Sequence, residues 1–213
     1  MASLDHVVIG AANLDQGAEF VEALLGVRAG PGGVHEGAGT HNLLLGLGEG
    51  AYLEVISPDP AQPEPALPRL FGLDDARLLR RLAARPALIA WVARTEELDA
   101  LAARLGHRDL GPVRPMSRVG LSWRFASPPA GADFGGLLPS MIEWAEPARP
   151  PSLPASGCRL LGLEGGHPEP DLLAAALAQR GLSHAMRIGH SPVPRLAITL
   201  SGPDGRPRSL AST

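Results

Sequence analysis

Three polar side chains that can bind metals or transfer protons interrupt otherwise apolar segments of this 213-residue chain. They are His6 before Val7-Val8-Ile9, Glu54 between Leu53 and Val55, and Glu143 between Ile142 and Trp144. A carboxylate in apolar surroundings is unfavourable unless it is paired or bound to a cation. A histidine with two carboxylates suits divalent ions such as Zn, Mn, Fe or Ni. We therefore expect one divalent metal here, acting as a Lewis acid.

The same residues also allow structural interpretations, and we keep both open. His6 is compatible with a hydrogen-bonded core histidine. The two glutamates could instead pair with Arg118 or Arg124 on neighbouring strands. Four further side chains are expected to line a substrate cavity, with arginine holding a carboxylate through paired hydrogen bonds. These candidate substrate-binding residues are Trp91, Arg118, Trp123 and Arg124.

The elements that must position these groups follow a repeated pattern. A short apolar strand at 4–9 leads to Asn13, which can cap a helix over 14–25, and Gly26 ends that helix. A glycine-rich stretch, 30–39, then leads into strands at 40–47 and 51–56, which are joined by a turn. This first unit closes at a proline-rich connector, whose continuation, 71–84, has helical periodicity.

The pattern then starts again. A strand at 88–93, a helix over 96–105 and strands at 110–118, 120–126 and 138–144 repeat the first order. Tyr52-Leu53-Glu54-Val55-Ile56 and Ser140-Met141-Ile142-Glu143-Trp144 are similar strand ends. We therefore predict an α+β fold of tandem βαβββ modules. The boundaries are 1–60 for the first module, 61–86 for the connector with its helix, 87–146 for the second module, and 147–213 for a linker and a C-terminal partial βαββ extension.

Composition excludes several functions. The net charge is -3 without a dense basic run, which argues against nucleic acid or an anionic membrane as partner. All nineteen basic residues are arginine, so lysine-dependent chemistry is excluded. The glycine-rich stretch has no dinucleotide pattern, so no nucleotide-binding residues are predicted. One cysteine, Cys158, and no segment resembling a membrane span or leader indicate a cytoplasmic protein.

Three groups of motifs follow one another along the chain: Leu4-Asp5-His6-Val7-Val8-Ile9 with Asn13-Leu14-Asp15, Gly39-Thr40-His41-Asn42-Leu43-Leu44-Leu45 with Tyr52-Leu53-Glu54-Val55-Ile56, and Gly136-Leu137-Leu138-Pro139 with Met141-Ile142-Glu143-Trp144. In this order they resemble the vicinal-oxygen-chelate superfamily, which includes glyoxalases, bleomycin-resistance proteins and dioxygenases, and in particular its glyoxalase-like branch. The resemblance covers roughly residues 4–146. It implies that the two modules form an open curved-sheet half-barrel around a cavity.

The resemblance also implies metal ligands on the first and last strands of each module. Carried over by position, these are His6, Glu54 and Glu143. The remaining ligand would fall near Ile89 or Ala90, neither of which binds metals. His41 is the candidate substitute, although alternation does not settle which way it faces. Alternatively, the absence of a ligand near Ile89 or Ala90 indicates that the site binds no metal.

The resemblance implies a glyoxalase-like enzyme acting on a small molecule with adjacent oxygens. We expect a lyase or isomerase step through proton abstraction beside a carbonyl, with Glu54 or Glu143 as the base. The alternative is a metal-free protein that sequesters small molecules, as antibiotic-resistance members of the family do. Ring-cleaving dioxygenases of the family bind their metal through two histidines and one glutamate. The second of these histidines is missing here, so this chemistry is disfavoured. A homodimer is left open.

Overall fold

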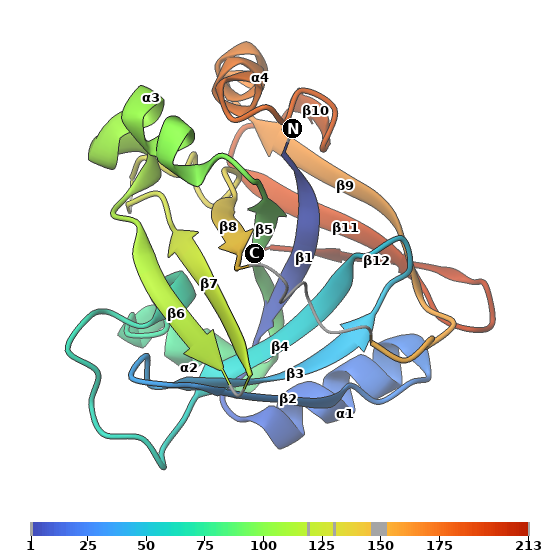
Figure 1. The fold of residues 1–213 in the computed structure, drawn as a ribbon. Coiled ribbons are helices and arrows are strands. Elements are labelled where there is room, and N and C mark those ends of the chain that lie inside the picture. The colour runs from blue at the N-terminus through green and yellow to red at the C-terminus, as the bar shows by residue number, and fades with distance from the viewer. Residues whose placement is uncertain (1, 119, 130, 146–152, 213) are drawn as a thin grey trace.

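The computed structural model describes residues 2–118, 120–129, 131–145 and 153–212, which form two β-sheets flanked by helices (Figure 1). The predicted boundary at 146/147 and the start of the linker after it lie outside these residues. The first module consists of β1 (Ser3–Gly10), α1 (Leu14–Leu25), β2 (Gly30–His35), β3 (Thr40–Gly46) and β4 (Tyr52–Pro58). The connector holds a short 3₁₀ turn, η1 (Leu70–Gly72), and α2 (Ala76–Ala84). The second module consists of β5 (Ala87–Arg94), α3 (Leu98–Leu110), β6 (Arg114–Arg118), β7 (Leu121–Ala126) and β8 (Ser140–Trp144).

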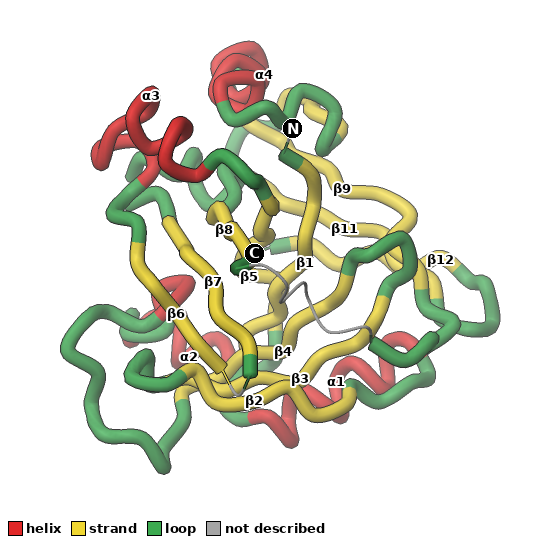
Figure 2. The backbone as a smooth tube through the Cα atoms, viewed as in Figure 1, coloured by secondary structure: helices red, strands yellow, loops and turns green. Residues whose placement is uncertain are grey.

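The two modules share one 8-stranded sheet in the order β2-β3-β4-β1-β5-β8-β7-β6. In each module the first strand pairs in parallel with the last, and β1 and β5 join the modules in antiparallel fashion. The sheet curls until its edge strands β2 and β6 contact each other (Figure 2). The predicted α+β fold with tandem βαβββ modules is therefore confirmed, with the cavity more nearly closed than a half-barrel.

A second, 4-stranded sheet follows at the C-terminus, with the order β10-β9-β11-β12. Its elements are β9 (Arg159–His167), α4 (Pro170–Gln179), β10 (Arg187–His190), β11 (Arg195–Ser201) and β12 (Pro207–Ala211). This unit has one strand more than the predicted partial βαββ extension. Its pairing also differs from that of the modules, because β9 pairs in parallel with the strand directly after the helix.

Alternation along β1 separates two hydrophobic cores. Val7 and Ile9 belong to a large cluster that includes the C-terminal unit, whereas Val8 belongs to a smaller cluster inside the curl of the sheet. Trp91 on β5 lies in the large cluster, and its indole Nε1 donates to the Leu137 carbonyl at 2.9 Å. The C-terminal unit therefore covers the outer face of the central strands, and the inner face surrounds the cavity.

The end signals of α1 are confirmed. Asn13 accepts a hydrogen bond from the Gln16 amide at 2.9 Å, and Gly26 adopts φ 75° at the C-terminal cap. Gly106, at φ 69° and ψ 173°, is non-helical and divides α3 into two helical segments, so the first segment ends where the sequence predicts, although it begins at Leu98 and not at position 96. None of the helices in the described ranges is both long and apolar enough to cross a bilayer.

Gly17 on α1 permits the close approach of this helix to β4. A Cβ atom at this position would lie 2.3 Å from Cγ1 of Val55, which is fully buried and has little room to move. Helix propensity alone would make Gly17→Ala stabilising by up to about 1 kcal/mol. We expect overpacking to outweigh this gain and to lower the free energy of unfolding by about 1–3 kcal/mol. Urea denaturation measures the sign, and a more stable variant would contradict the expectation.

Candidate functional site

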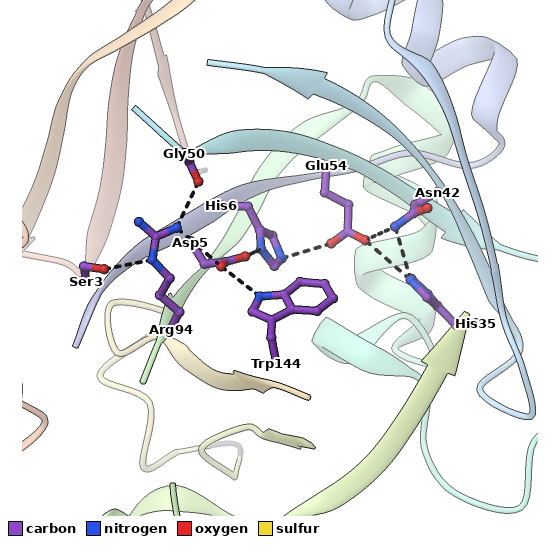
Figure 3. Close-up of polar contacts among 9 residues, drawn as sticks. All are labelled: Ser3, Asp5, His6, His35, Asn42, Gly50, Glu54, Arg94 and Trp144. Carbon is purple, nitrogen blue, oxygen red and sulfur yellow. Dashed lines mark hydrogen bonds and ion pairs between the residues drawn. The ribbon is translucent and has the colours of Figure 1, made fainter. Parts of the chain in front are cut away.

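A β-bulge in β1 brings two consecutive polar residues into contact. The register with β5 shifts between Leu4 and His6, so Asp5 is the extra residue of the bulge. His6 Nδ1 lies 2.7 Å from Asp5 Oδ1, and the two residues are 4% and 0% exposed (Figure 3). In a regular strand they would point to opposite faces. The bulge thus places a carboxylate directly behind the imidazole.

Asp5 is itself held by two side chains from the second module. Trp144 Nε1 donates to Asp5 Oδ2 at 3.1 Å, and the Arg94 guanidinium lies 3.8 Å from the same oxygen (Figure 3). Arg94 is fixed in turn by the Gly50 carbonyl and the Ser3 hydroxyl. A carboxylate held in this way orients the ring of its histidine partner. It leaves His6 Nε2 directed toward the inner face of the sheet.

Glu54 on β4 meets His6 across this inner face. Its Oε2 lies 3.4 Å from His6 Nε2, and its Oε1 accepts a hydrogen bond from Asn42 Nδ2 at 2.5 Å. His35 Nε2 lies 3.7 Å from Oε1 and 3.2 Å from the Asn42 amide nitrogen. Asp5, His6, Glu54, Asn42 and His35 form a continuous buried row, which we call the polar row (Figure 3).

The glycine-rich stretch contributes β2, and side chains of the site occupy the space that Cβ atoms on this strand would fill. A Cβ atom at Gly32 would lie 2.1 Å from Asn42 Oδ1, and one at Gly33 would lie 2.7 Å from Cδ of Arg118. The Gly33 amide donates to Asn42 Oδ1 at 2.9 Å, and Arg118 donates to the same oxygen at 2.8 Å. Both glycines therefore allow the backbone to approach the end of the polar row.

The charges of the row determine its protonation. Burial alone would lower the pKa of His6, but hydrogen bonds to Asp5 and Glu54 and their charges outweigh it and raise the pKa to about 9. Burial alone would raise the pKa of Glu54, but His6, His35 and Asn42 lower it to about 2. Burial lowers the pKa of His35, assisted by the charges of Arg118 and His6. At neutral pH the centre is an imidazolium–carboxylate pair beside a neutral histidine.

These shifts predict how stability depends on pH. The contribution of His6 is complete below its unfolded pKa of 6.5 and is lost as the pH rises through about 9, a change of about 3 kcal/mol at 1.36 kcal/mol per unit. The contribution of Glu54 is complete above 4.5 and is lost as the pH falls through about 2. We expect thermal unfolding to show a plateau between 4.5 and 6.5 with a decline on the alkaline side.

Differential scanning calorimetry across this range tests the expectation. Few other groups complicate the alkaline limb, because the chain has no lysine, one cysteine and one tyrosine. The decline should be smaller in Glu54→Gln, where His6 retains Asp5 as its single anionic partner. An alkaline limb of equal size in both proteins would contradict the assignment to His6.

The polar row opens on a small cavity, which we call the inner chamber. Its walls include Tyr52, whose ring stacks on His6 at 4.5 Å, and Trp123, which packs against Trp144. Its volume is about 20 Å³, which is room for a water-sized group. Arg118 also lines this space. Of the predicted substrate-binding residues, Arg118 and Trp123 therefore lie at the same cavity as His6 and Glu54.

Glu143 and Arg124 lie elsewhere. Glu143 accepts hydrogen bonds from Arg124 and, at 3.1 Å, from the Leu98 amide at the start of α3. Arg124 also pairs with Asp99 on that helix. The neighbours of Glu143 on β8, Ile142 and Trp144, line the inner chamber, so alternation directs Glu143 to the outer face. The structure thus places it away from His6, in the ion pair that was the structural alternative.

Trp91 and His41 also fail to reach the inner chamber. Trp91 is fully buried in the outer core. His41 Nδ1 lies 3.8 Å from Asp59, and its Nε2 has no hydrogen-bond partner within the described part of the chain. The next residue on β3, Asn42, faces Glu54, so His41 points to the opposite face. The metal set predicted from the sequence is therefore not assembled.

Sequence reasoning missed three members of the polar row. A histidine in a glycine-rich stretch is expected to be exposed to solvent, but His35 is only 3% exposed and lies on β2. Nothing in the residue pattern marks Asp5 or Asn42 as a site residue. A bulge that aligns neighbouring side chains leaves little trace in one sequence. The clustered glycines at 30–33 were the available signal, because glycine within a strand often marks close approach.

The donors that remain were tested against a divalent ion. His6 and Glu54 point at one space, and Asp5 supports the histidine as a carboxylate commonly does in metal sites. Both donors are, however, already paired with each other. Across residues 2–118, 120–129, 131–145 and 153–212, no three His, Cys, Asp or Glu side chains form a group able to hold a metal ion. The set of His6, Glu54, Glu143 and His41 therefore does not fit a single metal ion.

The class of fold is defined by two βαβββ modules that share one curved sheet around a cavity. A family model described as "Glyoxalase-like domain" matches residues 4–181. The chain belongs to this glyoxalase-like family, and the resemblance seen in the sequence is confirmed. No curated protein matches the sequence.

One solved structure shares this fold over most of the chain. A hypothetical protein from Staphylococcus aureus is similar with a TM-score of 0.63 and 14% identity, covering 91% of this chain and 88% of that one. A methylmalonyl-CoA epimerase from Mycobacterium tuberculosis has a TM-score of 0.42 and 19% identity, covering 67% and 86%. A Streptomyces coelicolor methylmalonyl-CoA epimerase variant in complex with 2-nitronate-propionyl-CoA has a TM-score of 0.46 and 20% identity, covering 67% and 94%.

Proposed function

We propose that this glyoxalase-like protein is an enzyme that moves a proton on the carbon beside a carbonyl group, in an isomerase or lyase step on a small molecule. The buried His6–Glu54 pair, with Asp5 behind the histidine and a cavity in front, supports this proposal. A proton donor and a proton acceptor facing one space match what such a step requires.

In the proposed step the substrate oxygen takes the place of Glu54 as the hydrogen-bond acceptor of His6. The pKa of Glu54 is low because His6 stabilises its charge, so it is a weak base in the resting pair. Loss of that partner raises its pKa toward the working range. Glu54 then accepts the proton from the substrate carbon, and His6 Nε2 donates a proton to the oxygen, which leaves an enol.

The fate of this enol separates the two reaction types. Protonation of the same carbon on its opposite face inverts its configuration and gives an isomerase, as does protonation of the neighbouring carbon where the intermediate is an enediol. In both cases the hydroxyl proton is lost as the carbonyl re-forms. Expulsion of a leaving group from the next carbon gives a lyase. Asn42 continues to donate to Glu54 Oε1 throughout and orients the carboxylate. Arg118, which holds Asn42, fixes that amide in turn.

The proposal is tested by proton exchange. The protein is incubated in D₂O with a panel of 2-oxo acids, 2-hydroxy ketones and acyl thioesters, and loss of the signal beside the carbonyl is followed by NMR. Catalysed exchange with any of them supports the proposal. Exchange with none, combined with tight binding of a panel member, would favour the sequestering protein. That alternative is supported by Trp123 and Trp144, which give the cavity aromatic walls beside a carboxylate.

The predicted divalent metal is tested separately. Because His6 and Glu54 are engaged with each other and Glu143 and His41 point elsewhere, we expect substoichiometric metal in tag-free protein purified without chelators. We also expect no thermal stabilisation by added Zn or Mn. Plasma mass spectrometry measures the content, with His6→Ala as the comparison. One equivalent that disappears in His6→Ala would contradict this expectation and restore the metalloenzyme predicted from the sequence.

A further inference from the structure

The cavity inside the large sheet is divided into two parts. Beside the inner chamber lies a second space of about 510 Å³, which we call the outer chamber. Both chambers share three wall residues, Leu70, Phe71 and Phe125. The rings of Phe71 and Phe125 meet edge to face at 5.9 Å. A pair of aromatic side chains is therefore the partition between the polar row and the outer chamber.

Most of the residues that line the outer chamber are apolar. Its side-chain walls are contributed by the connector, β5, β7 and the segment before β8, and include Leu70, Phe71, Ile89, Ala90, Phe125 and Leu138. Arg69, Arg114 and Asp133 are its charged lining residues. Arg69 is already held by Glu64 and Asp74, and Arg114 donates to the Pro68 carbonyl. A space of this size and character is typical of small-molecule sites.

The partition has unusual backbone geometry. Phe71 adopts φ 55° and ψ 28°, a left-handed conformation that a bulky residue rarely occupies. Arg69, which lies just before Leu70, anchors the segment by donating from Nε to the Gly39 carbonyl at 3.1 Å. The connector thus holds the phenyl ring against Phe125 in a conformation that the surroundings impose.

The two volumes decide where a substrate can bind. About 20 Å³ admits a water-sized group, which is too little for a whole substrate, whereas the outer chamber has room for a chain of several carbons. We propose that the outer chamber binds an apolar aliphatic tail of the substrate, whose oxygen-bearing head reaches His6 and Glu54 when the rings of Phe71 and Phe125 move apart. This assignment rests on the proposed function and adds a substrate class to it.

The lining of the outer chamber by β5 agrees with this assignment. Ala90, opposite Val8 in the register of β1 and β5, lies in the wall of the outer chamber. The methyl group of this residue presents a hydrocarbon surface to the outer chamber. The second module thus contributes the apolar half of the cavity, and the first module contributes the polar row.

The test compares two series of probes by calorimetric titration: 2-oxobutanoate, 2-oxohexanoate and 2-oxooctanoate, and the plain acids butanoate, hexanoate and octanoate. We expect affinity to rise by up to about fourfold for each methylene group that becomes buried. Ala90→Phe, which fills the outer chamber, should reduce the longest members to the affinity of the shortest. If Ala90→Phe does not fold, Ala90→Leu replaces it and should reduce the affinity of the longest members by a smaller factor. Ala175→Phe, on the exposed face of α4, is the matched control.

Each outcome bears on one proposal. Affinity that does not depend on chain length, retention of that dependence in Ala90→Phe, or no binding by either series would overturn the outer-chamber assignment. Length-dependent binding without catalysed exchange would leave the chamber standing and remove the proposed enzyme activity. Catalysed exchange of short compounds, with affinities that do not depend on chain length, would support the enzyme activity and overturn the outer-chamber assignment.

Discussion

Glu54→Gln is expected to slow catalysed exchange beside the substrate carbonyl by about 10²–10⁴-fold, the usual contribution of a general base. The amide preserves the shape of the side chain and can still accept a hydrogen bond from Asn42, but it cannot accept the substrate proton. Exchange of the panel compounds in D₂O, followed by NMR, gives the rate. The melting temperature, measured in parallel, establishes that the variant is folded.

Two further variants sharpen this result. Glu22→Gln, on an exposed ion pair with Arg28, should exchange at the wild-type rate. Glu143→Gln should do so as well, because Glu143 pairs with Arg124 on the outer face. A large loss of exchange rate in Glu143→Gln, together with a normal rate in Glu54→Gln, would identify Glu143 as the base, which is the other candidate from the sequence.

His6→Ala is expected to lower the free energy of unfolding by about 3–5 kcal/mol, because removing one partner leaves an uncompensated buried charge. Here two carboxylates are affected, Asp5 at 0% exposure and Glu54 at 4%. The stacking of His6 on Tyr52 is lost as well. Urea denaturation at pH 6, within the expected stability plateau, measures the loss.

The double variant His6→Ala with Glu54→Ala distinguishes charge from packing. Removing both partners eliminates the stranded Glu54 carboxylate, so the double variant should lose less than the sum of the two single variants. Strict additivity would show that the pair has no coupling. A loss below about 1 kcal/mol in His6→Ala, the range of exposed ion pairs, would show that the imidazole is not charged in the folded protein.

Much of the fold could be predicted because its signals are local. Asn13 and Gly26 mark the ends of α1, and the repeated strand ends at Glu54 and Glu143 reveal the two modules. The repeat also suggested equal roles for the two glutamates. That inference does not carry over, because β4 directs Glu54 inward while β8 directs Glu143 outward.

The parts of the site that could not be predicted depend on which face of a strand a residue occupies. Ile142 and Trp144 on one face and Met141 on the other are all apolar, so the pattern of β8 does not reveal the orientation of Glu143. The same ambiguity concealed the outward direction of His41. Contacts across the sheet, such as that of Asn42 with His35, arise only once strand register is established.

The catalytic candidates and the partition residue lie in parts of the molecule that differ in local stability. The strand lies between β4 and β5, with the C-terminal unit packed in the core on its outer side, so it is expected to open only when the whole protein unfolds. Asp5 and His6 therefore lie where sequence drift is least tolerated. The partition residue Phe71 belongs instead to a surface connector with little regular structure. Exchanges in that connector could reshape the preference for substrates over evolutionary time while the proton-transfer groups stay fixed.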